Sequence, residues 1–467
     1  MKTEQIEHSG FWWDPAKPNE RWAGTLHINR KGRSTLTLTV EPASFAAWFH
    51  LREFDVLHGE TTSGRPMSVL KCFEQKHGRF FVNATIIGLH AETADPTIAR
   101  SAVVIRNVNI WWGPSAIENV DIEKWPDEAT VRYTKPQPVV VFDDGVFTIT
   151  ISSGAGVTSK EMAHTVVEEI RIEIAAISPR PFSEFSKRIY ACRDLFSVAC
   201  LSLCNVQELR LYPVLDDSAR RRFQAATYHA SPIFRERKSD RPTSWHDLLF
   251  RREDVSSERL KDVFTTWLGQ ADRFHVVRSL YHAGSYGKGF LEFRFLSLAQ
   301  AAEAYHNRAF PKRTYLSKAD YKARVLDPVQ SVLPKDLDDR LRESIESALA
   351  FGNQIKFRER LEDLFAEHSA ALATVVPTPS DWINKIKNYR NAFTHHPTNR
   401  DTTPFDHEDV LRCLFMLKML LEMAFLRSMG FTPEEITGFA KRNHRYSQIK
   451  ERFFTDRQMK QAVDTTA

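Results

Sequence analysis

Hydrophobic and polar residues alternate with the two-residue period of a β-strand through much of the first half of the chain. The alternation is clearest in residues 35–40, TLTLTV, and Asp144-Gly145 separates two β-branched runs as a hairpin turn does. Many short strands with turns between them predict a sandwich or a distorted barrel. The predicted strands are residues 35–40, 80–89, 102–112, 139–152, 166–177 and 208–214.

The second half of the chain changes to the helical period, with apolar residues recurring every three or four positions. Similar helical stripes occur earlier, at residues 181–205 and 255–281, and the small residues of 283–289 predict a linker. The predicted helices of the second half are residues 290–308, 318–332, 336–351, 354–367, 381–395, 406–429 and 433–442.

This change of period predicts an α+β protein with several domains. Residues 1–215 are expected to form a β-rich, sandwich-like domain with a helical insertion near 181–205. Residues 216–285 are expected to form a basic, partly helical connector, and residues 286–445 an all-α helical bundle. Residues 446–467 remain as a C-terminal tail.

One predicted helix carries an arginine and a histidine near its end, in the stretch DWINKIKNYRNAFTHHP of residues 381–397. Pro397 disfavours helical geometry in the residue before it, so the helix is expected to end near His395. The planar guanidinium of Arg390 suits a phosphate, and the imidazole of His395 suits proton transfer near neutral pH. The alternative is an arginine and a histidine that only pair with acids or cap carbonyls at a helix end.

Arg390, a polar residue after it, and a histidine after four intervening positions form a pattern that resembles the signature of HEPN ribonucleases. The neighbouring predicted helices 290–308 and 406–429 resemble those of the HEPN domain in ApeA-like abortive-infection proteins. The N-terminal sequence GFWWDPAKPNERWAGTLHINRKGRSTLTL and the later VNIWWGP resemble the β-rich domain that precedes HEPN in that family.

The resemblance implies RNA cleavage without a metal or another cofactor. The 2′-hydroxyl would attack the adjacent phosphate, with His395 as general base or acid and Arg390 on the phosphate. The product would carry a 2′,3′-cyclic phosphate. The resemblance also implies a cytoplasmic homodimer or higher homo-oligomer that acts in antiviral defence, with a phage-derived trigger and a sensing or restraining N-terminal domain.

Three residues are predicted to support this site. Asn391 precedes His395 by one helical turn and is positioned to orient its imidazole; it also fits a solvated surface residue. Glu303 lies beside the apolar stripe of helix 290–308, where it can support the site or form an ordinary ion pair. His396 is the rival imidazole to His395.

Composition limits the possible partners. The net charge of +5 permits an acidic partner such as RNA without requiring one. The most apolar run, in helix 406–429, contains three charged residues, so a membrane span is not expected. The five cysteines lack metal-ligand spacing and are interpreted as reduced, buried thiols. A basic stretch fits either an RNA backbone or a solvated surface; its residues include Arg220, Arg221, Arg222, Arg235, Arg237 and Lys238.

A rival hypothesis is a non-catalytic dimer. In that case the helical domain only dimerises, and the aromatic-rich N-terminal domain binds a ligand or a phage protein. Trp12, Trp13, Trp111 and Trp112 fit either base stacking or core packing, and packing is the commoner role.

Overall fold

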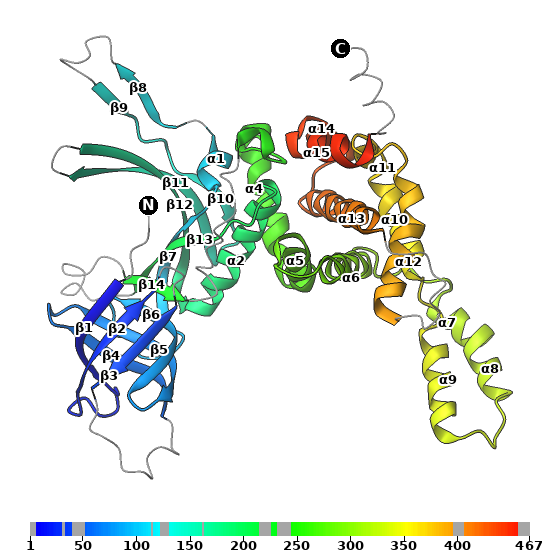
Figure 1. The fold of residues 1–467 in the computed structure, drawn as a ribbon, viewed down its shortest axis with the longest axis horizontal. Helices are drawn as coiled ribbons and strands as arrows, with labels where there is room; N and C mark the ends of the chain where they lie inside the picture. Colours follow the sequence, from blue (N-terminus) through cyan, green and yellow to red (C-terminus); the bar gives the residue numbers. More distant parts are fainter. Residues whose placement is uncertain are drawn as a thin grey trace. The chain divides into compact units, whose positions relative to one another are not determined.

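The computed structural model describes residues 6–29, 33–39, 52–113, 115–121, 130–160, 163–213, 226–230, 244–395 and 406–455. The chain divides into two compact units, Met1–Gly269 and Gln270–Ala467. The described part of the first unit is mostly β-sheet with a few helices, whereas that of the second is helical (Figure 1). The predicted α+β fold is confirmed.

The first six strands of the chain close into a barrel. β1 pairs with both β2 and β4, β3 bridges β2 and β6, and β5 joins β4 to β6. Closure leaves these strands without a free edge, and Trp12, Leu26, Leu36 and Phe80 fill the interior with no exposed surface. The strands are β1 (Ile6–Trp13), β2 (Trp22–Ile28), β3 (Ser34–Leu38), β4 (Glu53–Thr61), β5 (Pro66–Lys76) and β6 (Arg79–Ile87).

An open extension of the same sheet leaves the barrel at β6 and runs in the order β14, β13, β7, β12, β11, β10. The helices α2 and α4 pack with this extension, α2 on β7 and β12 and α4 on β10. Its members are β7 (Thr97–Ile105), β10 (Val139–Asp143), β11 (Phe147–Lys160), β12 (Ala163–Pro181), β13 (Val206–Pro213), β14 (Ala226–Ala230), α2 (Phe182–Ala199) and α4 (Ser257–Gly269). A separate hairpin joins β8 (Ile117–Asp121) to β9 (Thr130–Tyr133).

The predicted strand at residues 102–112 is wrong in its second half. β7 ends at Ile105, and a short helix, α1 (Val108–Trp112), follows. Asn107 adopts a φ of 67°, a left-handed conformation that asparagine tolerates better than most residues, and its carbonyl accepts the amides of Ile110 and Trp111. The turn buries the Trp111 ring completely, 5.0 Å from that of Phe196, so Trp111 is a core residue.

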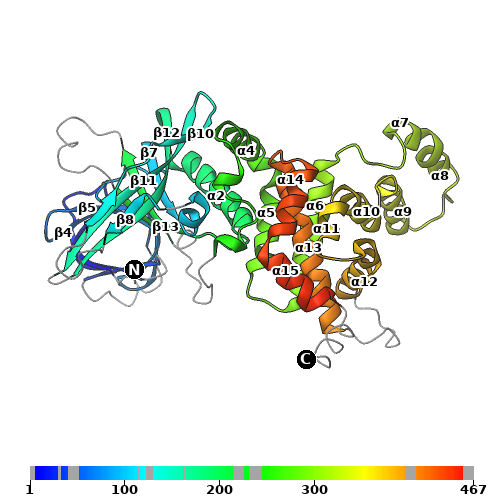
Figure 2. The same ribbon diagram turned by 90° about the horizontal axis from the view of Figure 1, so that it is seen from above.

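The second unit is a helical bundle around α13, which contacts α5, α6, α10, α11, α12 and α14 (Figure 2). Its α-helices are α5 (Ala271–Tyr286), α6 (Leu291–Ala309), α7 (Lys318–Tyr321), α8 (Asp327–Ser331), α9 (Asp339–Phe351), α10 (Phe357–Glu367), α11 (Ser369–Ala373), α12 (Trp382–His395), α13 (His407–Ser428), α14 (Pro433–Arg442) and α15 (His444–Ile449). Short helical turns join some of them: η4 (Lys322–Leu326) between α7 and α8, η5 (Pro379–Asp381) before α12, and η6 (Lys450–Phe454) after α15.

In the first unit, two further turns, η2 (Trp245–Asp247) and η3 (Arg252–Asp254), precede α4.

The bundle corrects two details of the sequence analysis. The predicted helix at 255–281 breaks between Gly269 and Ala271, which separates α4 from α5. The predicted linker at 283–289 is helical as far as Tyr286. Gly284 lies in this last part of α5, where a Cβ would stand 2.6 Å from Leu298 Cγ, so the glycine lets α5 approach α6 closely.

All five cysteines are buried free thiols, as predicted. None of the helices built from described residues combines the length and the apolarity that a bilayer span requires. Within the same residues, no three His, Cys, Asp or Glu side chains come together in a way that could hold a metal ion.

Candidate active site

The site is built on α12, which is fixed to the bundle along one side. Ile386 is fully buried, and Ile383 nearly so, against the neighbouring helices α6, α10 and α13. At the helix's solvent side, the ammonium of Lys385 lies 2.7 Å from a carboxylate oxygen of Asp409 on α13. Burial raises the pKa of Asp409, but hydrogen bonds from Lys385 and Arg412 outweigh it and hold that pKa below its ordinary value. The start of α12 is therefore tied to α13 by packing and by charge.

Aromatic side chains hold the second half of α12 against α6. The ring of Phe295, fully buried on α6, lies 5.7 Å from Phe393 and 6.4 Å from Tyr389, edge to face in both cases. Tyr389 and Phe393 stack on each other one turn apart. Edge-to-face pairs of this kind contribute roughly 0.5–1.5 kcal/mol beyond the burial of their area. The cluster orients the turn that carries Arg390.

Arg390 extends from this turn toward solvent, with 31% of its side chain exposed. Its Nη2 lies 3.6 Å from Oε2 of Glu303, and its Nη1 donates to Oδ1 of Asn391 at 3.3 Å. The guanidinium carbon stands 5.6 Å from the ring centre of Phe357, a cation–π distance. Three elements, α6, α10 and α12 itself, thus set the position of one charged group.

These contacts leave the guanidinium able to receive an anion. Arginine has five N–H donors, and the contacts to Glu303 and Asn391 involve only its two terminal nitrogens at long distances. Glu303 is also 31% exposed, and ion pairs at this exposure contribute only about 0–1 kcal/mol. A phosphate dianion or diester can therefore compete with Glu303 for Arg390, or join it.

The structure describes the side chains of some predicted site residues but not of others. Arg390, Asn391 and Glu303 come together: Glu303 forms the predicted ion pair, with Arg390, and its role in supporting the site stays a prediction. His395 is the last residue of α12, five positions after Arg390, which corresponds to an axial rise of about 7.5 Å. Its side chain, like all of His396, lies outside the described residues, as do the basic residues predicted at 220–222, 235, 237 and 238.

Sequence reasoning did not predict that Phe357 contacts Arg390, nor that Phe295 packs against Tyr389 and Phe393. Phe357 is the first residue of α10, and its ring reaches Arg390 only because α10 packs against α12. Nothing in the local sequence around residue 357 marks that contact. The apolar stripes on the two helices predicted that Phe295 and Phe393 are buried, but they did not predict that the two rings contact each other.

The helical unit and the β-rich unit each match a known family. Residues 7–267 match the model of ApeA N-terminal domain 1, and residues 296–435 match the model of the Apea-like HEPN domain. The protein therefore consists of an N-terminal ApeA domain followed by a HEPN domain, a class of domain that is typically a ribonuclease. The chain belongs to the ApeA family. Neither a curated protein nor a solved structure matches it significantly.

Proposed function

We propose that this protein is a metal-independent endoribonuclease of the HEPN type that acts in abortive infection against phage. The observation that carries the proposal is the guanidinium of Arg390. It is partly exposed, it is oriented by contacts from three helices, and it belongs to the same helix end as His395. Together with the HEPN match, this arrangement supports a site for a phosphodiester.

The proposed reaction begins with the ribose 2′-hydroxyl. A neutral imidazole, that of His395, takes its proton as the 2′-oxygen attacks the adjacent phosphorus. The bond from phosphorus to the 5′-oxygen breaks, and that oxygen receives a proton. The products are a 2′,3′-cyclic phosphate and a 5′-hydroxyl. No electron is transferred and no water is consumed, so the step needs neither a redox partner nor a metal-bound hydroxide.

Two proton transfers call for a base and an acid, and a single imidazole cannot perform both at once. We propose that two copies of the chain associate so that the second His395 supplies the second group. Each positioned proton transfer is worth about 10²–10⁴ in rate. Arg390 holds the non-bridging oxygens and stabilises the charge that accumulates on them, an effect worth about 10²–10³ for a single donor.

RNA is the substrate class that a HEPN domain suggests, and we propose tRNA as one candidate. The N-terminal ApeA domain is proposed to sense a phage-derived trigger or to restrain cleavage until one arrives. Both steps are proposed to take place in the cytoplasm. Expression of the active protein should then arrest growth, and the His395→Ala variant should not.

Cleavage of total RNA in the presence of EDTA tests the proposal. Arg390→Ala and His395→Ala should each abolish cleavage, whereas the exposed residues Arg340 and His275, changed to alanine in the same way, should leave it intact. Circular dichroism and thermal unfolding verify that each variant is folded. Cleavage that survives in both site variants would contradict the proposed roles.

A specific observation favours one rival. An arginine that pairs with a carboxylate and an aromatic ring, as Arg390 does, is also what a purely structural residue looks like. The rival is a non-catalytic dimer that binds a ligand or a phage protein. It predicts intact RNA under all triggers and a loss of stability in Arg390→Ala.

A further inference from the structure

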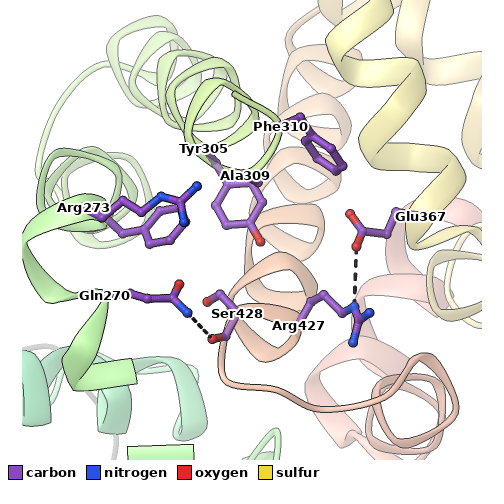
Figure 3. A pocket seen from close by; sticks show the side chains of 9 residues that line it. Gln270, Arg273, Tyr305, Ala309, Phe310, Glu367, Arg427 and Ser428 are labelled. Carbon is purple, nitrogen blue, oxygen red and sulfur yellow. Dashed lines mark hydrogen bonds and ion pairs between the residues drawn. The ribbon is translucent and has the colours of Figure 1, made fainter. Parts of the chain in front are cut away.

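A pocket lies in the helical unit, formed by residues other than those around Arg390. It is a pocket of about 200 Å³ at the ends of four helices (Figure 3). The first turn of α5 and the last turns of α6, α10 and α13 supply its walls. The residues that matter for its chemistry are Gln270, Arg273, Tyr305, Phe310, Glu367 and Arg427.

Two guanidiniums face this pocket from different walls. Figure 3 shows Arg273 and Gln270 on one side and Arg427 and Glu367 on the other, with the ring of Tyr305 between them. Burial raises the pKa of Tyr305 above its ordinary value; the charge of Glu367 raises it further, whereas the charges of Arg427 and Arg273 oppose this. The charges of both guanidiniums therefore reach the same buried hydroxyl, that of Tyr305.

Each arginine already makes a structural contact. Arg273 donates to the carbonyl of Arg308 and so caps the end of α6. Arg427 donates at 3.2 Å to the carbonyl of Phe431, in the loop between α13 and α14. Each contact uses only one of the five N–H donors on a guanidinium. Arg427 also lies 3.6 Å from Oε1 of Glu367, a carboxyl whose pKa is raised by burial. These contacts hold both guanidiniums at the wall of the pocket, and each guanidinium has more N–H donors than these hydrogen bonds use.

The pocket also offers flat apolar surface. Tyr305 stacks on Phe274 with ring centres 5.2 Å apart, and both line the pocket. Phe310 lines another part of it and stacks on His306 at 4.7 Å. His306 is itself fixed by a 3.0 Å contact to Asp363, so the Phe310 ring has a rigid backing. Two cations, one carboxylate and aromatic walls favour an anion that carries a flat ring.

We propose that this pocket binds a phosphate monoester whose organic part is a flat ring, with the phosphate between Arg273 and Arg427 and the ring against Phe310. Phosphate suits the site better than carboxylate, because its oxygens point in several directions and meet donors on two walls. The site draws on four helices of the bundle, so a bound ligand would stabilise the helical unit by mass action. Binding in this pocket does not require ribonuclease activity.

Calorimetric titration of the full-length protein with phenyl phosphate tests the proposal, with inorganic phosphate and benzoate as partial ligands. Adenosine monophosphate is titrated as well, to test whether the natural ligand of the pocket is a nucleotide. Phenyl phosphate should bind at least tenfold more tightly than either partial ligand, and it should raise the temperature of unfolding. Equal binding of inorganic phosphate and phenyl phosphate would overturn the role of the ring.

Matched variants decide whether binding occurs in this pocket. Arg273→Gln and Phe310→Leu should each weaken phenyl phosphate at least tenfold, whereas the exposed Arg340→Gln should not. Because Arg273 also caps α6, its variant is first checked for an unchanged unfolding temperature without ligand. The Phe310 variant leaves both guanidiniums in place. Unchanged affinity in both variants, or no binding by the wild type at millimolar ligand, would refute the proposal.

Discussion

The guanidinium of Arg390 on α12 faces the carboxylate of Glu303 on α6 at 3.6 Å, and the two side chains are equally exposed. If Arg390 binds a phosphate as proposed, an acid this close can orient the guanidinium and can also compete with the phosphate. Both the orientation of Arg390 and the competition with phosphate follow from the Coulomb attraction between two partly exposed, and therefore partly screened, charges. The pair thus gives a direct way to separate binding from catalysis.

The Glu303→Gln substitution should lower KM for RNA several-fold, because it removes the charge that competes with the phosphate. It should also lower kcat, because Arg390 loses one of its orienting contacts. The exposed Glu343→Gln is the control. Steady-state cleavage kinetics measure both constants. If neither constant changes, Glu303 is an ordinary surface acid.

The Phe295→Ala substitution should lower the free energy of unfolding by about 3–5 kcal/mol, as expected for a large aromatic removed from a core. Phe293, two residues earlier on α6 and 57% exposed, is the matched control, and its alanine variant should change stability by less than about 0.5 kcal/mol. The milder Phe295→Leu should stay folded but lose part of its activity, because Phe393 and Tyr389 no longer fix the turn that carries Arg390. Denaturant titration and cleavage assays check these outcomes. Activity equal to wild type in Phe295→Leu would show that the aromatic cluster does not position Arg390.

The Glu422→Ala substitution should destabilise the helical bundle by about 3–5 kcal/mol. Glu422 on α13 has no exposed surface and accepts hydrogen bonds from Tyr281 at 2.6 Å and Tyr446 at 2.8 Å. Removing it leaves two buried hydroxyls without their acceptor and one partner, Lys418, without its counter-ion. Glu422→Gln, which keeps one acceptor, should cost less. Scanning calorimetry measures both variants; a neutral Glu422→Ala would mean that the network does not support the fold.

The stability of the bundle should fall as the pH drops from about 6.5 toward 4, partly because of His368. Burial, with the charge of Arg427 added, lowers the pKa of His368 to about 4. The unfolded chain binds this proton near pH 6.5, so stability is full above that pH and declines by up to about 3 kcal/mol as the pH falls to the folded-state pKa. His368→Leu should flatten this decline, and the exposed His275→Leu should not. An unchanged pH profile in His368→Leu would show that the proton is bound elsewhere.

The positions of the helices were largely predictable, and their partners were not. The pattern of residues 381–395 predicted α12 to within one residue, because an apolar stripe and a proline define a helix locally. The contacts of Arg390 with Glu303 and Phe357 join residues far apart in sequence, and no local pattern encodes which helices pack together. Glu303 was reached through its place beside an apolar stripe and a family resemblance, whereas Phe357 had no signal at all.

The β-rich unit shows the same limit. Alternation predicted strands, but closure of the barrel depends on the pairing of β1 with β4 and of β3 with β6, and side-chain period alone does not specify these pairs. The strand predicted through residue 112 failed because Asn107 takes a left-handed conformation and starts a helix that buries Trp111. Tertiary burial of one tryptophan outweighed the β-propensity of its neighbours.

The chemical identity of RNA ends is the most direct test of the central claim. RNA is incubated with wild-type protein and with the His395→Ala variant in EDTA, and the new ends are mapped. We expect 2′,3′-cyclic phosphates and 5′-hydroxyls at discrete positions with the wild type, and no new ends with the variant. New ends that carry 5′-phosphates, or identical ends from the two proteins, would contradict it.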